Sequence, residues 1–198
     1  MIDREHDLPI TKQAAALNIS RGSVYYLPRP VSASDLEVMR RAVDALAEFD
    51  LAAEVRVLSA HRTPDDALAW ARGAADRGLR VLVAGAGAAA HLPGVLAAVT
   101  SLPVIGVPIA ATPLDGMDSL LAIAQMPSGV PVACVAVDGA RNAGLLAVRI
   151  LGTGDAALRR RFDAFREQLA DEVRAKDDRV REEFEHRRTG GVPTIGFR

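Results

Sequence analysis

The sequence predicts an α/β protein whose parallel sheet lies between two layers of helices. Three apolar runs of strand length, at residues 79–84, 104–109 and 130–137, are separated by helix-sized segments. Nearly uninterrupted apolar runs are typical of strands that are covered on both faces. A strand-helix-strand-helix rhythm indicates a doubly wound parallel sheet. With 198 residues, the chain is long enough for one such domain and a short appendage.

Composition and charge exclude several classes of protein. A formal net charge of −1 excludes a basic, nucleic-acid-binding surface along the whole chain. No apolar run reaches the ~18 residues of a membrane span, and the first nine residues lack the apolar stretch of a secretory signal. The single cysteine, Cys134, excludes a disulfide framework and fits a reducing compartment. We therefore expect a cytoplasmic protein without a membrane segment.

The first elements of this domain are predicted from periodicity and capping signals. Apolar residues recur at helical spacing at Met39, Val43 and Leu46. Residues 54–58 then alternate as a strand does, and we expect this strand to join the sheet. The hydroxyl of Thr63 followed by Pro64 predicts the start of a capped helix, and Gly78 predicts its end.

A long amphipathic helix is predicted to begin at Asp155. Its apolar face consists of Leu158, Phe162, Phe165, Leu169 and Val173. This helix is longer than a sheet of this size can cover, so we expect it to pack on another subunit. The alternative is a solvated surface helix of the same chain. The two glycines at residues 190–191 break any helix, and we expect residues 176–198 to form a mobile tail.

Residues 8–31 depart from the α/β rhythm. Thr11 can cap one short helix, and residues 21–26 can begin a second, which is a helix-turn-helix pattern. This segment resembles the N-terminal region of insertion-element transposases. Its charge is weak and one helix pair buries little surface, so we do not expect DNA binding. The predicted organisation is an atypical leader (1–31), an α/β domain (32–175) and the tail.

Candidate functional residues follow two of the predicted strands. Ligands of open parallel sheets bind beyond the carboxyl ends of the strands. Ser59, His61 and Arg62 follow the first of these strands, before a helix N-terminus. Histidine exchanges protons near neutral pH, and arginine binds phosphate through two parallel hydrogen bonds. Small residues at 85–90 allow a ligand close to the backbone, and His91 follows them. The two histidines are expected to form a polar pair in an otherwise apolar pocket.

Other interpretations of these residues have less support in the sequence. Each histidine taken singly could serve only as a hydrogen-bonding residue. The Gly-x-Gly-x-x-Ala pattern at 85–90 mimics a dinucleotide fingerprint, but the acid expected about 20 residues later is absent from 103–108. No third ligand accompanies the histidines at motif spacing, so no metal site is expected. No oriented acid follows Ser59 and His61 to make a catalytic triad, and Cys134 is expected to be a core residue.

Taken together, five segments follow the order and spacing of one family. They are residues 59–64, 85–94, 103–108, 118–121 and 125–132. From about residue 32 to 173 the chain resembles the N-carboxyaminoimidazole ribonucleotide mutases, or phosphoribosylaminoimidazole carboxylase catalytic subunits, of purine biosynthesis. The resemblance implies a flavodoxin-like strand order. It also implies cofactor-free carboxyl transfer, without a metal, from the exocyclic nitrogen to the ring carbon of an aminoimidazole ribonucleotide.

The resemblance also implies roles for individual residues. His61 matches the proton shuttle, Arg62 the phosphate-binding arginine, and the segment containing His91 the carbon dioxide pocket. The substrate-binding positions that it implies are Ser32, Asp35, Ser59, Arg62, Gly85, Ala86, Gly87, Ala88, His91 and Leu92. It further implies a homo-octamer in which the C-terminal helix reaches a neighbour. A related carboxylase acting on another heteroaromatic nucleotide is the alternative function.

Three positions depart from the family's pattern. Ala88 stands where the family has the second of two glycines, and the loop at 138–142 is shorter than its counterpart. The family's first strand, central in the sheet, is replaced by residues 26–31, which include Pro28 and Pro30. Proline cannot donate to a strand ladder, so this stretch is poor material for a central strand. A further alternative is therefore an inactive fusion product whose central strand is disrupted.

Overall fold

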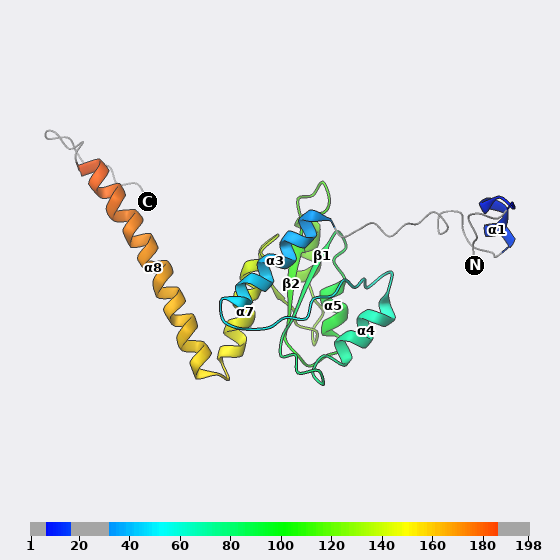
Figure 1. Cartoon of the computed structure of the whole chain (residues 1–198), viewed down its shortest axis with the longest axis horizontal. Coiled ribbons are helices and arrows are strands. Elements are labelled where there is room, and N and C mark those ends of the chain that lie inside the picture. Colours follow the sequence, from blue (N-terminus) through cyan, green and yellow to red (C-terminus); the bar gives the residue numbers. More distant parts are fainter. Residues whose placement is uncertain (1–6, 17–31, 186–198) are drawn as a thin grey trace. The chain divides into compact units, whose positions relative to one another are not determined.

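The computed structural model describes residues 7–16 and 32–185 (Figure 1). The chain divides into two compact units, Met1–Glu37 and Val38–Arg198, so the division falls later than the expected one after residue 31. Helix α1 (Ile10–Ala16) lies in the first unit. Helix α3 (Ala33–Ala47) begins in the first unit and ends in the second. The second helix expected at 21–26 and the replaced strand at 26–31 lie outside the described residues.

Helix α1 begins two residues earlier than a cap at Thr11 predicts. The backbone N–H groups of Lys12 and Gln13 donate to the carbonyl of Pro9 at 2.8 and 3.1 Å. Pro9 therefore occupies the position before the first turn, and Thr11 lies inside the helix. The cap expected at Thr11 is wrong, because proline supplies both the fixed φ and the free carbonyl that the first turn needs.

The second unit contains a three-stranded parallel sheet in the order β1-β2-β3. Strand β1 (Leu82–Gly87) pairs along its whole length with β2 (Val104–Ile109), and β2 pairs with the two-residue strand β3 (Ala133–Cys134). Strand β2 has the predicted limits. Strand β1 begins at Leu82 rather than at residue 79, and β3 is shorter than the apolar run at 130–137. The parallel α/β class is confirmed.

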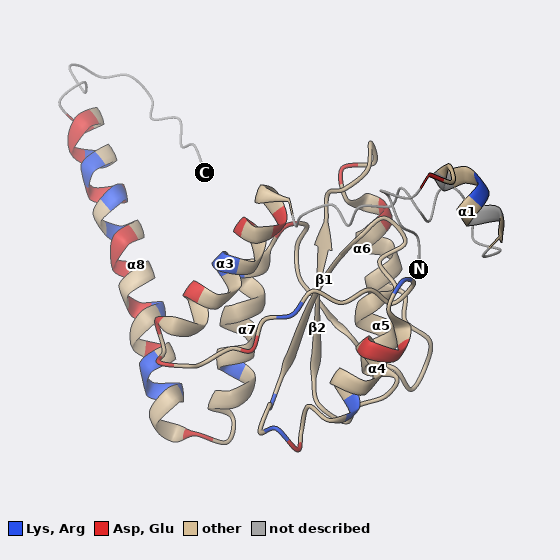
Figure 2. Ribbon diagram, turned by 45° about the vertical axis from the view of Figure 1, so that its right-hand side comes forward, with Lys and Arg blue, Asp and Glu red and all other residues tan. Residues whose placement is uncertain are grey.

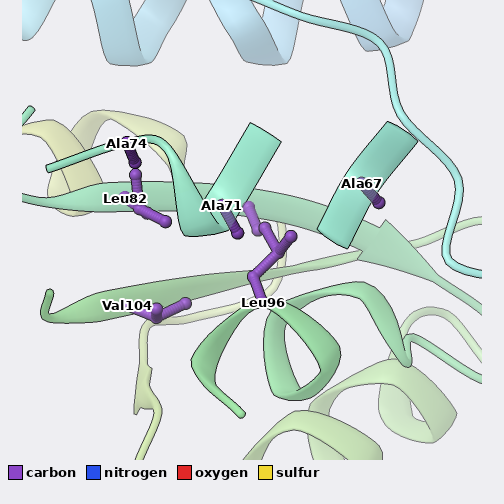
Figure 3. Packing of buried hydrophobic residues seen from close by; sticks show 7 residues of the cluster. Ala67, Ala71, Ala74, Leu82, Leu96 and Val104 are labelled. Atoms are coloured by element: carbon purple, nitrogen blue, oxygen red, sulfur yellow. The ribbon is translucent and has the colours of Figure 1, made fainter. Parts of the chain in front are cut away.

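Helices cover both faces of this sheet, as Figure 2 shows. Helices α4 (Pro64–Arg72) and α5 (Leu92–Ala97) pack on one face around Leu82 and Val104 (Figure 3). Helix α6 (Met117–Ala124) packs on the same face. Ile123 of α6 lies so close to Gly106 of β2 that a side chain at Gly106 would overlap it. Helices α3 and α7 (Ala140–Gly152) pack on the opposite face. The three layers place the loops after β1, β2 and β3 at one edge of the sheet.

Helix α4 starts where the sequence predicts, but its capping differs. Pro64 is the first helical residue and Thr63 occupies the cap position, yet the Thr63 side chain makes no capping hydrogen bond. Its hydroxyl binds the backbone of Ser59 instead. The helix ends at Arg72 with Gly73 as its cap, rather than at Gly78. Gly78 has φ +87° and ends the turn that follows the helix.

The strand predicted at residues 54–58 does not form. This stretch has no regular secondary structure, and Val55 and Val57 are 52% and 65% exposed. Only Leu58 packs against the core beside Leu82. A strand needs a ladder partner, and within the described residues β1 pairs only with β2. The flavodoxin-like order, which places further strands beyond β1, is therefore incomplete in the described part of the sheet.

Helix α8 (Ala156–Glu185) confirms the long helix predicted to begin at Asp155. The Asp155 carboxylate accepts backbone N–H groups from Ala157 and Leu158 at 2.8 and 3.0 Å. Phe162 and Phe165 pack on Phe49 in a cluster with Leu158 and Val148. The helix continues to Glu185, so residues 176–185 extend it rather than forming the tail that was expected from residue 176. None of the described helices combines the length and apolarity needed to cross a bilayer.

Candidate active site

The structure brings together the two histidines that the sequence places 30 residues apart. His61 Nε2 and His91 Nδ1 are 2.7 Å apart and share a hydrogen bond. Their rings are almost perpendicular, with an interplanar angle of 81° and centroids 4.8 Å apart. Both side chains are exposed in the single chain. The predicted polar pair of imidazoles is confirmed.

His61 lies on the turn before α4, and hydrogen bonds between Ser59 and Thr63 close this turn. The Ser59 N–H donates to Thr63 Oγ1 at 3.0 Å, and the Thr63 N–H donates back to the Ser59 carbonyl at 3.0 Å. The Arg62 N–H donates to Ser59 Oγ at 3.2 Å. Ser59 therefore uses its side chain to fix the turn. His61 and the exposed Arg62 are presented together at the start of the helix.

His91 is held by a loop with unusual backbone conformations. Ala88 and Ala90 have φ of +54° and +45°, in the left-handed region that costs a non-glycine residue about 1–2 kcal/mol. The Ala90 N–H donates to the Gly87 carbonyl at 3.0 Å, and the Ala90 side chain is buried. A Cβ on Gly87 would lie 2.6 Å from the Ala111 Cβ, so only glycine fits there. These contacts leave the backbone before His91 little freedom to change its conformation.

Ala88, which departs from the family's glycine pattern, is one of these two strained positions. A glycine adopts positive φ without strain, whereas the Cβ of alanine meets the following carbonyl oxygen. The side chain of Ala88 is exposed, so the penalty here is in the backbone. Gly85 and Ala86 precede it in β1, and Leu92 begins α5. The predicted binding positions from Gly85 to Leu92 therefore form one continuous strand-loop-helix connection.

Ser32 and Asp35 lie in the other compact unit. The Asp35 N–H donates to Ser32 Oγ at 3.0 Å, and Ser32 Oγ is 2.8 Å from Ser34 Oγ. Ser32 thus caps the first turn of α3 in the manner usual for serine. Their assignment to substrate binding stays a prediction.

Asp138 is a residue of this sheet edge whose position the sequence did not indicate. It has φ +54°, and its N–H donates to the Pro108 carbonyl at 2.8 Å. Its Oδ1 accepts the Ala110 N–H at 3.2 Å, which ties the loop after β3 to the loop after β2. Aspartate before glycine is a common turn signal and tolerates this conformation. That signal could have identified the tie within the shortened loop at 138–142.

Chemically, the site offers a proton-exchanging imidazole pair and a guanidinium beside it. One imidazole can pass a proton along the shared hydrogen bond or to a bound molecule. Arg62 and the amides at the start of α4 favour an anionic group. No group of three or more metal-binding side chains gathers within residues 7–16 and 32–185. The arrangement suits acid-base chemistry on a phosphorylated ligand.

Comparison with known proteins places this site in a family. The sequence model of AIR carboxylase matches residues 30–172. The N5-carboxyaminoimidazole ribonucleotide mutase of Mycobacterium tuberculosis (strain CDC 1551) is 64% identical over 146 residues, or 74% of this chain and 84% of that protein. The phosphoribosylaminoimidazole carboxylase of Schizosaccharomyces pombe is 52% identical over 149 residues, which are 75% of this chain and 27% of that longer protein.

A solved structure has the same fold. Treponema denticola PurE superposes with a TM-score of 0.67 at 24% sequence identity, and the match covers 75% of this chain and 93% of that one. The fold, the matched family model and the identity to curated relatives agree on one assignment. The chain belongs to the AIR carboxylase family.

Proposed function

We propose that the chain catalyses the N5-carboxyaminoimidazole ribonucleotide mutase reaction of de novo purine biosynthesis. The carboxyl group on the exocyclic nitrogen of the substrate moves to the ring carbon. The observation that carries this proposal is the hydrogen bond between His61 and His91, in a chain 64% identical to a mutase of this name. The imidazole pair supplies the one function that the reaction requires of a side chain, which is proton transfer.

The reaction balances with a single proton carrier. The bond between nitrogen and the carboxyl carbon breaks, the nitrogen takes a proton, and carbon dioxide is released. The ring carbon attacks the carbon dioxide, which forms the new carbon-carbon bond, and then loses its own proton. His61 gives the first proton and takes the second, so that no net proton, electron or cofactor is consumed.

The neighbouring segments have distinct parts in this proposal. Arg62 holds the phosphate of the ribonucleotide, and the segment from Gly85 to Leu92 lines the space in which carbon dioxide is retained. His91 holds His61 through the shared hydrogen bond and so fixes the direction of its ring. Retaining the gas requires a site from which water is excluded.

Replacement of His61 by asparagine tests the proposal. Turnover of the carbamate substrate should fall by at least about 100-fold, since a positioned general acid-base typically contributes 10²–10⁴-fold. The exposed side chain contributes little packing, so the thermal melt should be unchanged. His186→Asn, outside the matched residues 30–172, is the control and should keep full activity. Parental turnover in the His61 variant would exclude the proton-shuttle role.

Arg62→Lys tests the phosphate contact separately. A lysine keeps the charge but cannot reproduce two parallel hydrogen bonds to a phosphate. The KM for the ribonucleotide should rise about tenfold, while kcat changes less. Arg72→Lys, at the far end of α4, is the matched control. An unchanged KM in the Arg62 variant would remove this residue from the binding site.

Assembly into a homo-octamer is part of the same proposal. Leu169 and Val173 on α8 are 43% and 63% exposed, which gives the helix an apolar face for a neighbouring chain. His61 and His91 are exposed in the single chain, so a water-excluding pocket needs a cover from outside it. Light scattering should give an octameric mass, and Val173→Glu should lower it. An octamer that survives this change would remove this part of α8 from the interface.

Substrate and donor are tested by the same assay with different reactants. The carbamate, the free aminoimidazole ribonucleotide with bicarbonate, and other heteroaromatic nucleotides are offered in turn. Selective turnover of the carbamate supports the mutase. Turnover with the free ribonucleotide and carbon dioxide instead would favour the carboxylase reaction named for the Schizosaccharomyces pombe relative. Cytoplasmic location belongs to this proposal and is tested by cell fractionation.

A further inference from the structure

We propose that His61 and His91 together bind a divalent transition-metal ion such as Zn²⁺, Ni²⁺ or Cu²⁺. His61 Nε2 and His91 Nδ1 lie 2.7 Å apart and share one hydrogen. A nitrogen that accepts this hydrogen directs its lone pair at the other nitrogen. When the shared proton is released to water and the donor ring takes up a proton on its other nitrogen, both lone pairs converge on the same small space. Neutral imidazole nitrogens are the preferred protein ligands for these metals.

The geometry requires only a small adjustment. Two Zn–N bonds of about 2.0–2.1 Å at a tetrahedral angle place their nitrogens about 3.3 Å apart. The nitrogens must therefore separate by roughly 0.6 Å, which small side-chain rotations can provide. Both rings are exposed, so this movement displaces no core residue. The nearly perpendicular rings, at 81°, keep one imidazole from blocking the other's approach to the ion.

The backbone holds both ligands in place before a metal arrives. His61 is on the turn closed by the reciprocal hydrogen bonds of Ser59 and Thr63. His91 follows Ala90, which is buried and hydrogen-bonded to Gly87. Ligands on preorganised backbone lose less entropy on binding than ligands on mobile loops. A rigid pair of imidazoles is thus a chelate rather than two independent surface histidines.

The surroundings predict a weak, reversible site with open positions. No third His, Cys, Asp or Glu joins the pair in the described part of the chain, so at least two positions of a tetrahedral ion stay open to water. Arg62 brings a positive charge beside the pair, while Asp65 and Asp66 bring negative charge in the first turn of α4. Affinity should follow the general order for nitrogen ligands, with Cu²⁺ tighter than Ni²⁺ or Zn²⁺.

The metal ion would bind the same two ring nitrogens that share the proton, His61 Nε2 and His91 Nδ1. Because the ion and the proton compete for the same lone pairs, affinity should fall as the pH is lowered. On the proposed function, the ion would also inhibit turnover by engaging His61. That consequence rests on the proposed function, whereas binding itself does not. The binding experiment with Zn²⁺ therefore uses no substrate.

Calorimetric titration of the full chain with Zn²⁺ tests the site. The chain has four histidines, and His6 and His186 lie outside the described residues. The matched control is the double variant His6→Asn/His186→Asn, which should still bind one ion per chain. His61→Asn and His91→Asn should each weaken binding by at least about tenfold, since even loss of an outer partner of a metal ligand costs 10–100-fold. Mg²⁺, which prefers oxygen ligands, should not bind there.

Copper supplies an independent readout. The electron paramagnetic resonance spectrum of the Cu²⁺ complex should show coupling to two imidazole nitrogens, and to one in either single variant. Thermal melts identify any variant that fails to fold, and His61→Gln and His91→Gln then replace the asparagine variants. Equal Zn²⁺ affinity in His91→Asn and the parent overturns the proposal. So does loss of binding in the His6/His186 control, which would assign the ion to the chain termini.

Discussion

Strand β2 and residues 54–58 are both predicted as strands but have opposite structural outcomes. Residues 104–109 are apolar throughout, whereas residues 54–58 alternate and include Glu54 and Arg56. Ile105 and Val107 in β2 are 0% and 1% exposed, and β2 pairs with strands on both sides. Val55 and Val57 are mostly exposed and belong to no ladder. The two segments differ both in their sequence pattern and in their neighbours.

This comparison shows that a strand is a property of a pair of segments. Backbone N–H and C=O groups must be satisfied, and a strand satisfies them through the adjacent strand. The family's central strand would lie next to residues 54–58, and this chain has a proline-containing stretch, 26–31, at that place in the sequence. Within the described residues, 54–58 keep a strand pattern but have no ladder partner.

The largest expected difference between the two regions is in stability. Ile105→Ala removes a fully buried side chain and should lower the free energy of unfolding by about 2–5 kcal/mol. Val57→Ala removes a side chain that is 65% exposed and should change it by no more than about 0.5 kcal/mol. Denaturant unfolding followed by circular dichroism measures both. A large loss at Val57 would mean that residues 54–58 are buried in a sheet after all.

A smaller effect is expected from the strained loop after β1. Ala88→Gly relieves a left-handed conformation at φ +54° and should raise the free energy of unfolding by about 0.5–1 kcal/mol. Ala89→Gly is the matched control, because Ala89 is not among the described residues with positive φ. It should lower stability by about 0.4–1 kcal/mol through added unfolded-state entropy. Equal shifts in the two variants would contradict strain at Ala88.

The smallest effect concerns Glu54, whose side chain ties residues 54–58 to Trp70 of α4. Glu54 accepts hydrogen bonds from Trp70 Nε1 at 2.7 Å and from Arg77 Nε at 3.2 Å. The Trp70 hydrogen bond, more than the Arg77 contacts, lowers the pKa of the Glu54 carboxyl below its usual 4.5. A lowered pKa in the folded state means that the ionised carboxylate stabilises the fold above pH 4.5. This stabilisation is lost as the pH falls through the lowered pKa.

Glu54→Gln should therefore melt at a slightly lower temperature than the parent at neutral pH. The difference should disappear in acid, below the lowered pKa of Glu54. Thermal melts across this pH range measure the effect, with Asp76→Asn, an exposed acid of the turn after α4, as the control. A difference between Glu54→Gln and the parent that persists unchanged in acid would show that the charge of Glu54 is not responsible.

Local signals predicted much of what the structure shows. The continuous apolar run at 104–109 gave β2 its limits, because a strand buried on both faces is apolar throughout. Asp155 predicted the start of α8, and its carboxylate accepts the N–H groups of Ala157 and Leu158 in the first turn, as is usual for aspartate at a helix N-terminus. The prediction that the Thr63 hydroxyl caps α4 is wrong, because this hydroxyl binds the backbone of Ser59 instead of its own helix.

Short-range periodicity and side-chain chemistry were enough to predict the parallel α/β class, the long last helix and the two candidate histidines. Only the folded chain shows that the imidazoles are 2.7 Å apart, that Ala88 is left-handed and that residues 54–58 are not a strand. Each of these depends on contacts between segments far apart in the chain, and a local pattern does not specify the partner that a segment meets.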